Sequence, residues 1–127
     1  MARVPIVHVD TILIVTFLED LHDRDTVRLQ EEIGIALERT DATGVLLDLT
    51  LLEMVDSFLG RMVTEVAAHA KLLGASAVVV GIQPAVAVTL VELGLHLDGV
   101  LTALTAERGM KLLRNVRSRE SRQFSVH

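Results

Sequence analysis

The sequence predicts an α/β protein built on a mostly parallel sheet. Segments rich in β-branched apolar residues alternate along the chain with segments whose apolar residues recur at helical spacing. The later strand segments also lack the polar alternation of a half-solvated strand, which indicates that helices pack on the sheet. The pattern alone leaves open whether the helices cover one face of the sheet or both.

The first part of the chain predicts a hairpin followed by a helix. Strands are expected over 4–9 and 11–17, where Val, Ile and Thr are frequent, with a turn near Asp10. A helix follows over 22–40 because its apolar residues recur at helical spacing. Its candidate N-caps are Asp23 and Asp25, and its candidate apolar stripe is Val27, Ile33 and Leu37.

The middle of the chain predicts a strand, a helix and a second strand. The short apolar segment 44–49 and the continuous apolar segment 75–82 are typical of strands, and 57–74 between them is typical of a helix. Gly74 is expected to end this helix. The residues expected on its buried face are Leu59, Met62, Val63, Val66, Ala70 and Leu73.

The last elements are a short helix over 84–94, a strand over 99–104 and a helix over 105–116. Pro84 fits the first turn of the short helix, where no N–H is needed, and Gly94 fits the position after its end. No internal repeat or linker divides these elements, so the sequence predicts one domain.

Length and composition exclude several classes of protein. A chain of 127 residues can bury enough surface to fold without a disulfide or a metal ion. It has no cysteine, which excludes a thiol nucleophile and Cys-based zinc sites. No apolar run approaches the roughly 20 residues that span a bilayer, and the first residues lack the pattern of a signal peptide. We therefore expect a cytoplasmic protein that does not bind membranes.

Charge is unevenly distributed along the chain. Residues 114–127 hold four arginines and one glutamate, a net charge of +3, which leaves −8 for residues 1–113. An acidic body argues against a nucleic-acid-binding surface. The basic end has few apolar residues to bury, so we expect a single domain over 1–113 and a basic, disordered tail over 114–127.

The sequence lacks the residue patterns of common catalytic and cofactor sites. It has no glycine-rich phosphate loop, and its five histidines show no metal-ligand spacing. Without Tyr or Trp it has no aromatic platform for a base or a sugar. We therefore expect no cofactor, no metal site and no enzymatic activity.

The one carboxylate cluster of the sequence is Asp48, Glu53 and Asp56, which fall in or beside a single loop. Asp48, at the end of a strand, resembles the phosphoacceptor of a response-regulator receiver. That chemistry needs an acidic pair after the first strand to hold a divalent metal, and a lysine after a later strand. Here the first strands offer only Asp10 and the later strand continues as Gly-Ile-Gln-Pro, so the receiver interpretation is rejected.

Ser57 admits two interpretations. Asp or Ser before an apolar helix is the usual N-cap, worth about 1 kcal/mol. The same position offers free backbone N–H groups and the positive end of the helix dipole, which favour a negative charge. A phosphoryl group on Ser57 would add nearly two charges beside Asp56. It could be accommodated by the fold and still repel a partner docked over the helix start.

The segment 84–93 is unusually apolar, because only Thr89 and Glu92 are polar. A helix on the outside of a small domain buries one face, so some of Val86, Val88, Leu90 and Val91 should stay uncovered in a single chain. We expect Val86, Leu90 and Leu93 to face the core. The uncovered residues either mark an interface or are covered by the neighbouring loop and the last strand.

Two stretches carry a resemblance to a known family. "DLTLLEMVDSF", together with "GIQPAVAVTLVELGLHL" and the order of strands, resembles the STAS domain family of bacterial anti-sigma-factor antagonists. The likeness runs from residue 4 to about 113, and the second stretch is typical of the RsbS-type stressosome scaffolds. The resemblance implies a mixed sheet of four to five strands, with the N-terminal strands at its edge and about four helices mainly on one face.

The resemblance also implies a function. Such scaffolds are non-enzymatic, self-associate into a large assembly with RsbR-type paralogues, and sequester an RsbT-type serine kinase that departs after phosphorylating them in a stress-signalling pathway. Carried over by residue, Ser57 is the phosphoacceptor and Thr89 a looser second candidate. Asp56, Ser57 and Phe58 are the expected partner-binding residues. The alternative is a simple anti-sigma-factor antagonist that binds one anti-sigma kinase in a small complex.

Overall fold

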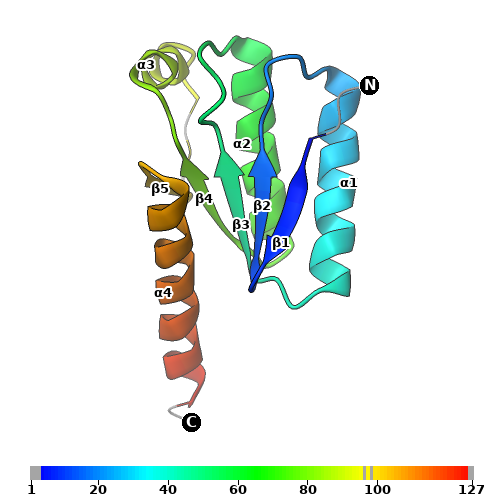
Figure 1. Ribbon diagram of the computed structural model, residues 1–127, viewed down its shortest axis with the longest axis vertical. Coiled ribbons are helices and arrows are strands. Elements are labelled where there is room, and N and C mark those ends of the chain that lie inside the picture. Colours follow the sequence, from blue (N-terminus) through cyan, green and yellow to red (C-terminus); the bar gives the residue numbers. More distant parts are fainter. Residues whose placement is uncertain (1–3, 96, 98, 126–127) are drawn as a thin grey trace.

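The computed structural model describes residues 4–95, 97 and 99–125, with side chains up to residue 116. In this part of the chain five strands form one sheet, three helices lie along its faces, and the fourth, over 84–92, lies beyond the strand ends (Figure 1). In chain order the elements are β1 (Ile6–Val9), β2 (Ile12–Thr16), α1 (Asp23–Arg39), β3 (Gly44–Asp48), α2 (Ser57–Leu72), β4 (Ser76–Val80), α3 (Pro84–Glu92), β5 (Leu101–Ala103) and α4 (Ala106–Ser125). The expected α/β class is confirmed.

The sheet follows the order of the chain, β1-β2-β3-β4-β5. β1 runs antiparallel to β2 and forms one edge, and all other neighbours are parallel. The hairpin turns at Asp10, which adopts the left-handed conformation with φ of 53°. The mixed sheet with the N-terminal strands at its edge, which the family resemblance implied, is therefore confirmed.

Both faces of the sheet carry a core, because side chains alternate across each strand. In β3, Val45 and Leu47 belong to the larger core, which also includes residues from α1, α2 and α3. Leu46 points to the other face, where Leu113 of α4 closes a smaller core. Three of the four described helices thus contribute to one core, and α4 covers the opposite face.

Three residues expected in the core are exposed instead: Val27 at 56%, Leu73 at 48% and Leu93 at 40%. α1 turns Leu29 and Ile33 inward, which leaves Val27 on its outer side. Leu73 and Leu93 are the C-cap residues of α2 and α3, and each is followed by a glycine of positive φ that turns the chain away. The periodicity therefore gave the right face for most helical residues, and it failed at Val27 within α1 and at the ends of α2 and α3.

The start of α1 also differs from the prediction. The N-cap is His22 rather than Asp23 or Asp25. Asp25 lies at the third helical position, where its carboxylate accepts the backbone N–H of His22 at 2.7 Å. This return bond is half of a capping box, so Asp25 stabilises the helix start from inside the helix.

α4 is longer than predicted. It packs closely on β4, because a Cβ on Gly109 would lie 2.5 Å from a methyl carbon of Val80. Its backbone is helical to Ser125, so most of the segment 114–127, for which we expected disorder, is helix. Residues 126 and 127 lie outside the described part, and the proposed boundary at residue 113 stays a prediction. No helix in the described residues has the length and apolar character needed to span a bilayer.

Candidate functional site

The candidate site lies at the start of α2, at the carboxyl end of β3. Asp56 is the N-cap residue: its carboxylate accepts the N–H of Leu59 at 2.8 Å, and its carbonyl accepts the N–H of Gly60 at 3.0 Å. Ser57 follows as the first helical residue and is exposed. Capping is therefore the role of Asp56, and the hydroxyl of Ser57 is open to solvent.

The loop before α2 is anchored on two sides. Asp48 accepts the backbone N–H of Thr50 at 2.9 Å, which turns the chain as it leaves β3. Further on, the N–H of Glu53 donates to the Glu19 carboxylate at 2.9 Å, which ties this loop to the loop after β2. Carboxyl ends of parallel strands meet at one edge of a sheet, and these bonds hold the two loops together there.

The segment between β4 and α3 supports the same loop. The side-chain amide of Gln83 donates to the carbonyl of Thr50 at 2.9 Å. Gly81 has φ of 72° and lies so close to Thr50 that an added Cβ would overlap its hydroxyl oxygen. The "GIQP" and "DLTLLEMVDS" stretches, separated in sequence, thus form one connected structure that positions the start of α2.

Two surface hollows flank the start of α2. One, of about 400 Å³, lies between α1 and α2 and is lined by Asp23, Thr26, Val27, Gln30, Ser57, Phe58, Arg61, Met62 and Glu65. The other, of about 690 Å³, is lined by Glu19, Asp20, Leu21, His22, Asp23, Arg24, Asp56 and Phe58. The half-buried ring of Phe58 lines both hollows. The three expected partner-binding residues therefore face one continuous surface.

The electrostatics of this surface are predominantly acidic. The second hollow carries four carboxylates, those of Glu19, Asp20, Asp23 and Asp56, against the one guanidinium of Arg24. In the first hollow, the buried hydroxyl of Thr26 has no hydrogen-bond partner among the described residues. Sequence reasoning missed these α1-side residues, although the rule that loops after parallel strands share an edge would have pointed to them.

Thr89 lies apart from the two hollows. It is in α3, half-buried, and its hydroxyl donates to the carbonyl of Ala85 at 3.0 Å. Val86 and Leu90 of the same helix face the core as expected, whereas Val88 and Val91 are 57% and 78% exposed. The structure thus separates the two candidate phosphorylation sites and places Thr89 beside an uncovered apolar strip.

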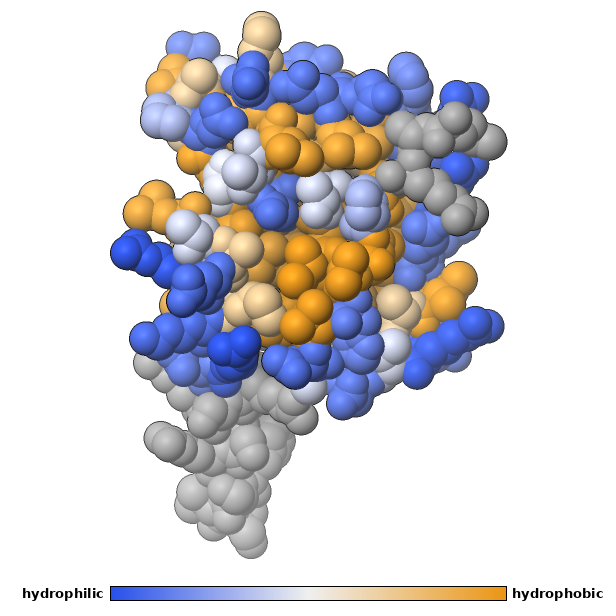
Figure 2. Space-filling view, viewed as in Figure 1, coloured by the Kyte–Doolittle hydropathy of each residue, from blue (hydrophilic) through white to orange (hydrophobic). Residues whose placement is uncertain are grey.

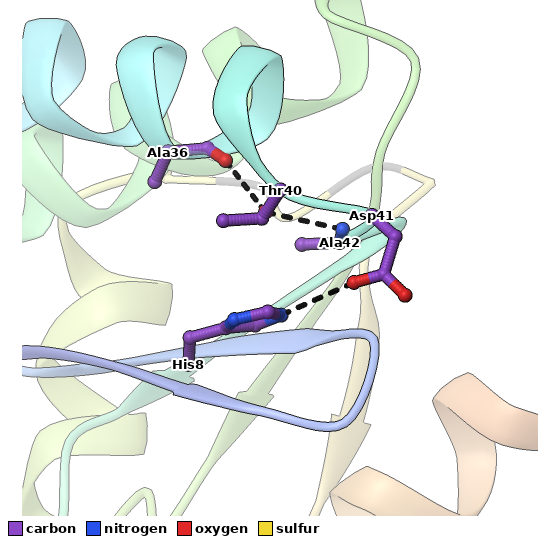
Figure 3. Close-up of polar contacts among 5 residues, drawn as sticks. All are labelled: His8, Ala36, Thr40, Asp41 and Ala42. Carbon is purple, nitrogen blue, oxygen red and sulfur yellow. Dashed lines mark hydrogen bonds and ion pairs between the residues drawn. The ribbon is translucent and has the colours of Figure 1, made fainter.

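The carboxylates of Asp48 and Asp56 accept different backbone N–H groups, whereas Glu53 donates its backbone N–H to the Glu19 carboxylate. Across the described residues, no group of three or more His, Cys, Asp or Glu side chains is arranged to hold a metal ion. His96 and His127 lie outside that part of the chain. At the opposite end of the sheet, His8 Nε2 lies 3.5 Å from Asp41 Oδ1 (Figure 3). Beside this pair, the Thr40 hydroxyl donates to the carbonyl of Ala36 at the end of α1.

Comparison with known proteins gives three close similarities. RsbS of Moorella thermoacetica, in a variant with a serine-to-glutamate substitution, is 38% identical, covers 92% of this chain and 99% of its own, and has a TM-score of 0.78. A chain in the solved architecture of the stressosome, a signal integration and transduction hub, is 40% identical, with coverages of 89% and 98% and a TM-score of 0.79.

The third similarity is to a longer protein. The RsbT co-antagonist protein RsbRA of Bacillus subtilis (strain 168) is 30% identical over 86 residues. These residues are 66% of this chain and 31% of that protein, so the chain spans about a third of the length of this curated relative. Finally, the family model described as the STAS domain matches residues 3–119. The chain therefore belongs to the STAS domain family.

Proposed function

We propose that this chain is a non-enzymatic scaffold of a stressosome-type assembly, which sequesters a serine/threonine protein kinase and releases it when Ser57 is phosphorylated. The observation that carries the proposal is the position of Ser57, an exposed hydroxyl at the start of α2 that the helix cap does not use. The 38% identity with RsbS and the 40% identity with a stressosome chain support the same assignment.

The physical basis of the switch is charge. A phosphoryl group on Ser57 adds nearly two negative charges beside Asp56 and the acidic second hollow. The helix dipole and the N–H groups of the first turn favour that charge, so the fold tolerates it. The new charge weakens the contacts that a kinase makes with this surface, and the affinity of the chain for the kinase falls.

The proposed kinase-docking surface consists of Asp56, Ser57 and Phe58. Phe58 is its apolar anchor, because its half-buried ring lines both hollows and offers partly exposed apolar surface between charged rims. The kinase proposed for this surface is of the RsbT type. Release of the kinase would then control a general stress pathway in the cytoplasm.

The proposed assembly partners are other copies of this chain and RsbR-type paralogues. Similarity to a stressosome chain and to RsbRA supports this part of the proposal. α3 offers a surface for such contacts, because Val88 and Val91, which lie three residues apart on one side of the helix, are both exposed. Thr89, half-buried between them, is the proposed second phosphorylation site.

The test uses the purified chain with an RsbT-type kinase and a paralogue from the same genome. Mass spectrometry after incubation with ATP should find phosphate on Ser57, and the Ser57→Ala chain should carry no phosphate at full stoichiometry on any other residue. Size-exclusion chromatography with the paralogue should give a very large particle. A complex of one kinase with one or two copies, and no large particle, would support the simple anti-sigma-factor antagonist instead.

A further inference from the structure

The hollow between α1 and α2 is lined by two rows of polar side chains. The row on α2 is Ser57, Arg61 and Glu65, and the row on α1 is Asp23, Thr26 and Gln30. Residues three or four apart lie on the same side of a helix, so the two rows face each other across the hollow. The apolar side chains in Figure 2 gather over the strands on the α4 side of the sheet, away from α1 and α2. The sheet therefore separates the polar rows from that apolar surface.

Arg61 is a cation without a partner in the described part of the chain. Its side chain is exposed, and its guanidinium forms no ion pair or hydrogen bond with another described residue. It lies one helical turn after Ser57, and an anion one turn before a cation stabilises a helix. A guanidinium also binds phosphate oxygens through two parallel N–H···O bonds. Arg61 is thus placed to pair with an anionic group on Ser57.

Thr26 has a hydroxyl that the fold leaves unused. The residue is 7% exposed, and its buried hydroxyl has no hydrogen-bond partner among the described residues. The hydroxyls of two other helical threonines, Thr64 and Thr89, donate to the carbonyl four residues earlier at 2.9 and 3.0 Å. Buried hydroxyls are normally bonded, and an unmade bond costs free energy. Threonine has two accessible rotamers in a helix, so a rotation of Thr26 lets its hydroxyl donate to a group that enters the hollow.

We propose that the hollow between α1 and α2 is the binding site of the phosphoryl group of Ser57, which Arg61 holds as an ion pair and Thr26 as a hydrogen-bond donor. This inference rests on the proposed function for the modification itself, and it adds two positioning residues to that function. Once Ser57 is phosphorylated, Arg61 is paired within the chain. Its charge is then no longer available to a docked partner.

The second hollow is a poorer site for the phosphoryl group. Ser57 lines the first hollow and does not line the second. The second hollow carries four carboxylates against the guanidinium of Arg24, whereas the first carries the carboxylates of Asp23 and Glu65 against Arg61. A group with nearly two negative charges is repelled less where fewer carboxylates surround it. Position and charge therefore favour the same hollow.

The test installs phosphoserine at position 57 during translation, so it needs no kinase. The second pKa of a phosphoryl group is about 6, and a nearby guanidinium lowers this pKa because it favours the dianion. Phosphorus NMR titration of the full chain should give a pKa lower in the parent than in Arg61→Gln by at least about 0.5, with Arg61→Lys between them. Asp23, Asp56 and Glu65 are present in every variant, so their carboxylates do not create this difference.

Arg24→Gln is the matched control, because it removes an arginine that lines the second hollow and not the first. It should change the pKa of the phosphoserine by less than half as much as Arg61→Gln. A pKa that Arg61→Gln leaves unchanged, or that Arg24→Gln raises equally, overturns the proposal.

A second measurement tests the hydroxyl of Thr26 through Thr26→Val, which keeps the shape of the side chain. The urea midpoint of the unmodified chain should not fall, because the hydroxyl has no partner among the described residues to lose. The midpoint of the phosphorylated chain should fall. A midpoint that is unchanged in both forms, or lowered equally in both, overturns the role of Thr26 in the site. The proposed function fails separately, if the kinase leaves Ser57 of the parent chain unmodified.

Discussion

The Asp56 carboxylate accepts the backbone N–H of Leu59 at 2.8 Å, and this bond makes Asp56 the cap of α2. Ser57, the next residue, is left with an exposed hydroxyl at the positive end of the helix dipole. The two adjacent residues therefore have separate roles: Asp56 caps the helix, and the hydroxyl of Ser57 is free to accept a phosphoryl group.

This division predicts effects of different size for two alanine substitutions. Asp56→Ala should lower the free energy of unfolding by about 1 kcal/mol, because the Leu59 N–H loses its partner. Ser57→Ala should change it by less than about 0.5 kcal/mol, since no cap bond is lost. Urea unfolding of both variants measures these changes. A loss for Ser57→Ala as large as that for Asp56→Ala would contradict the assignment of the cap.

Charge at Ser57 should weaken kinase binding. Ser57→Asp places a carboxylate beside Asp56 and the acidic second hollow, which raises the repulsion toward a docked partner. The effect should be smaller than that of phosphorylation, because a carboxylate carries less charge. Isothermal titration calorimetry on the kinase complex measures it, with Ser57→Asn as the uncharged control of the same shape. Equal affinity for the parent, the Asp variant and the phosphorylated chain would exclude the switch.

Charge on α3 should disturb assembly more than folding. Thr89→Glu puts a carboxylate beside the exposed Val88 and Val91, at a cost of several kcal/mol if an interface desolvates it. Light scattering with the paralogue should show a smaller particle, while the melting temperature of the isolated chain stays within a few degrees. Thr43→Glu, an exposed threonine at the opposite end of the sheet, is the control. If Thr89→Glu unfolds the isolated chain, the interface interpretation of α3 is wrong.

The loop that supports the site should depend on Gly81. An alanine there needs an unfavourable φ of 72° and overlaps Thr50, whose backbone nitrogen would lie 3.0 Å from the new Cβ. Gly94 has a similar φ of 68° but has nothing within 4 Å of an added Cβ among the described residues. Gly94→Ala should therefore cost about 1 kcal/mol and Gly81→Ala more than about 2 kcal/mol. Thermal unfolding of the pair separates the contact with Thr50 from the conformational strain.

The sequence predicted the fold where residue pattern and burial agree. Helices cover both faces of β3 and β4, so nearly every residue of these strands is buried and apolar. Such continuous apolar runs are recognisable in the sequence. Helix ends were less predictable, because Leu73 and Leu93 are apolar but lie where the backbone leaves the helix. α4 was predicted over 105–116, and only its continuation to Ser125 was missed, because the arginine-rich end gives little apolar periodicity to detect.

The candidate site was predictable only in part. Asp56, Ser57 and Phe58 are consecutive, so a single motif located them. Glu19 and Asp23 reach the same surface through the packing of α1 against α2 and through the bond of Glu53 to Glu19. Those contacts depend on how the layers assemble, so no local pattern predicts them, and only the rule that loops after parallel strands share an edge points to them.

The strand order β1-β2-β3-β4-β5 has a consequence for synthesis of the protein. Every strand after β1 pairs with the strand made just before it, so the sheet can grow at one edge as the chain leaves the ribosome. α1 and α2 emerge before the last two strands, whereas the helix that covers Leu46, Val78 and Val80 is translated after all five strands. Until α4 is made, the sheet therefore has one face covered by helices and one face on which Leu46, Val78 and Val80 have no helix over them.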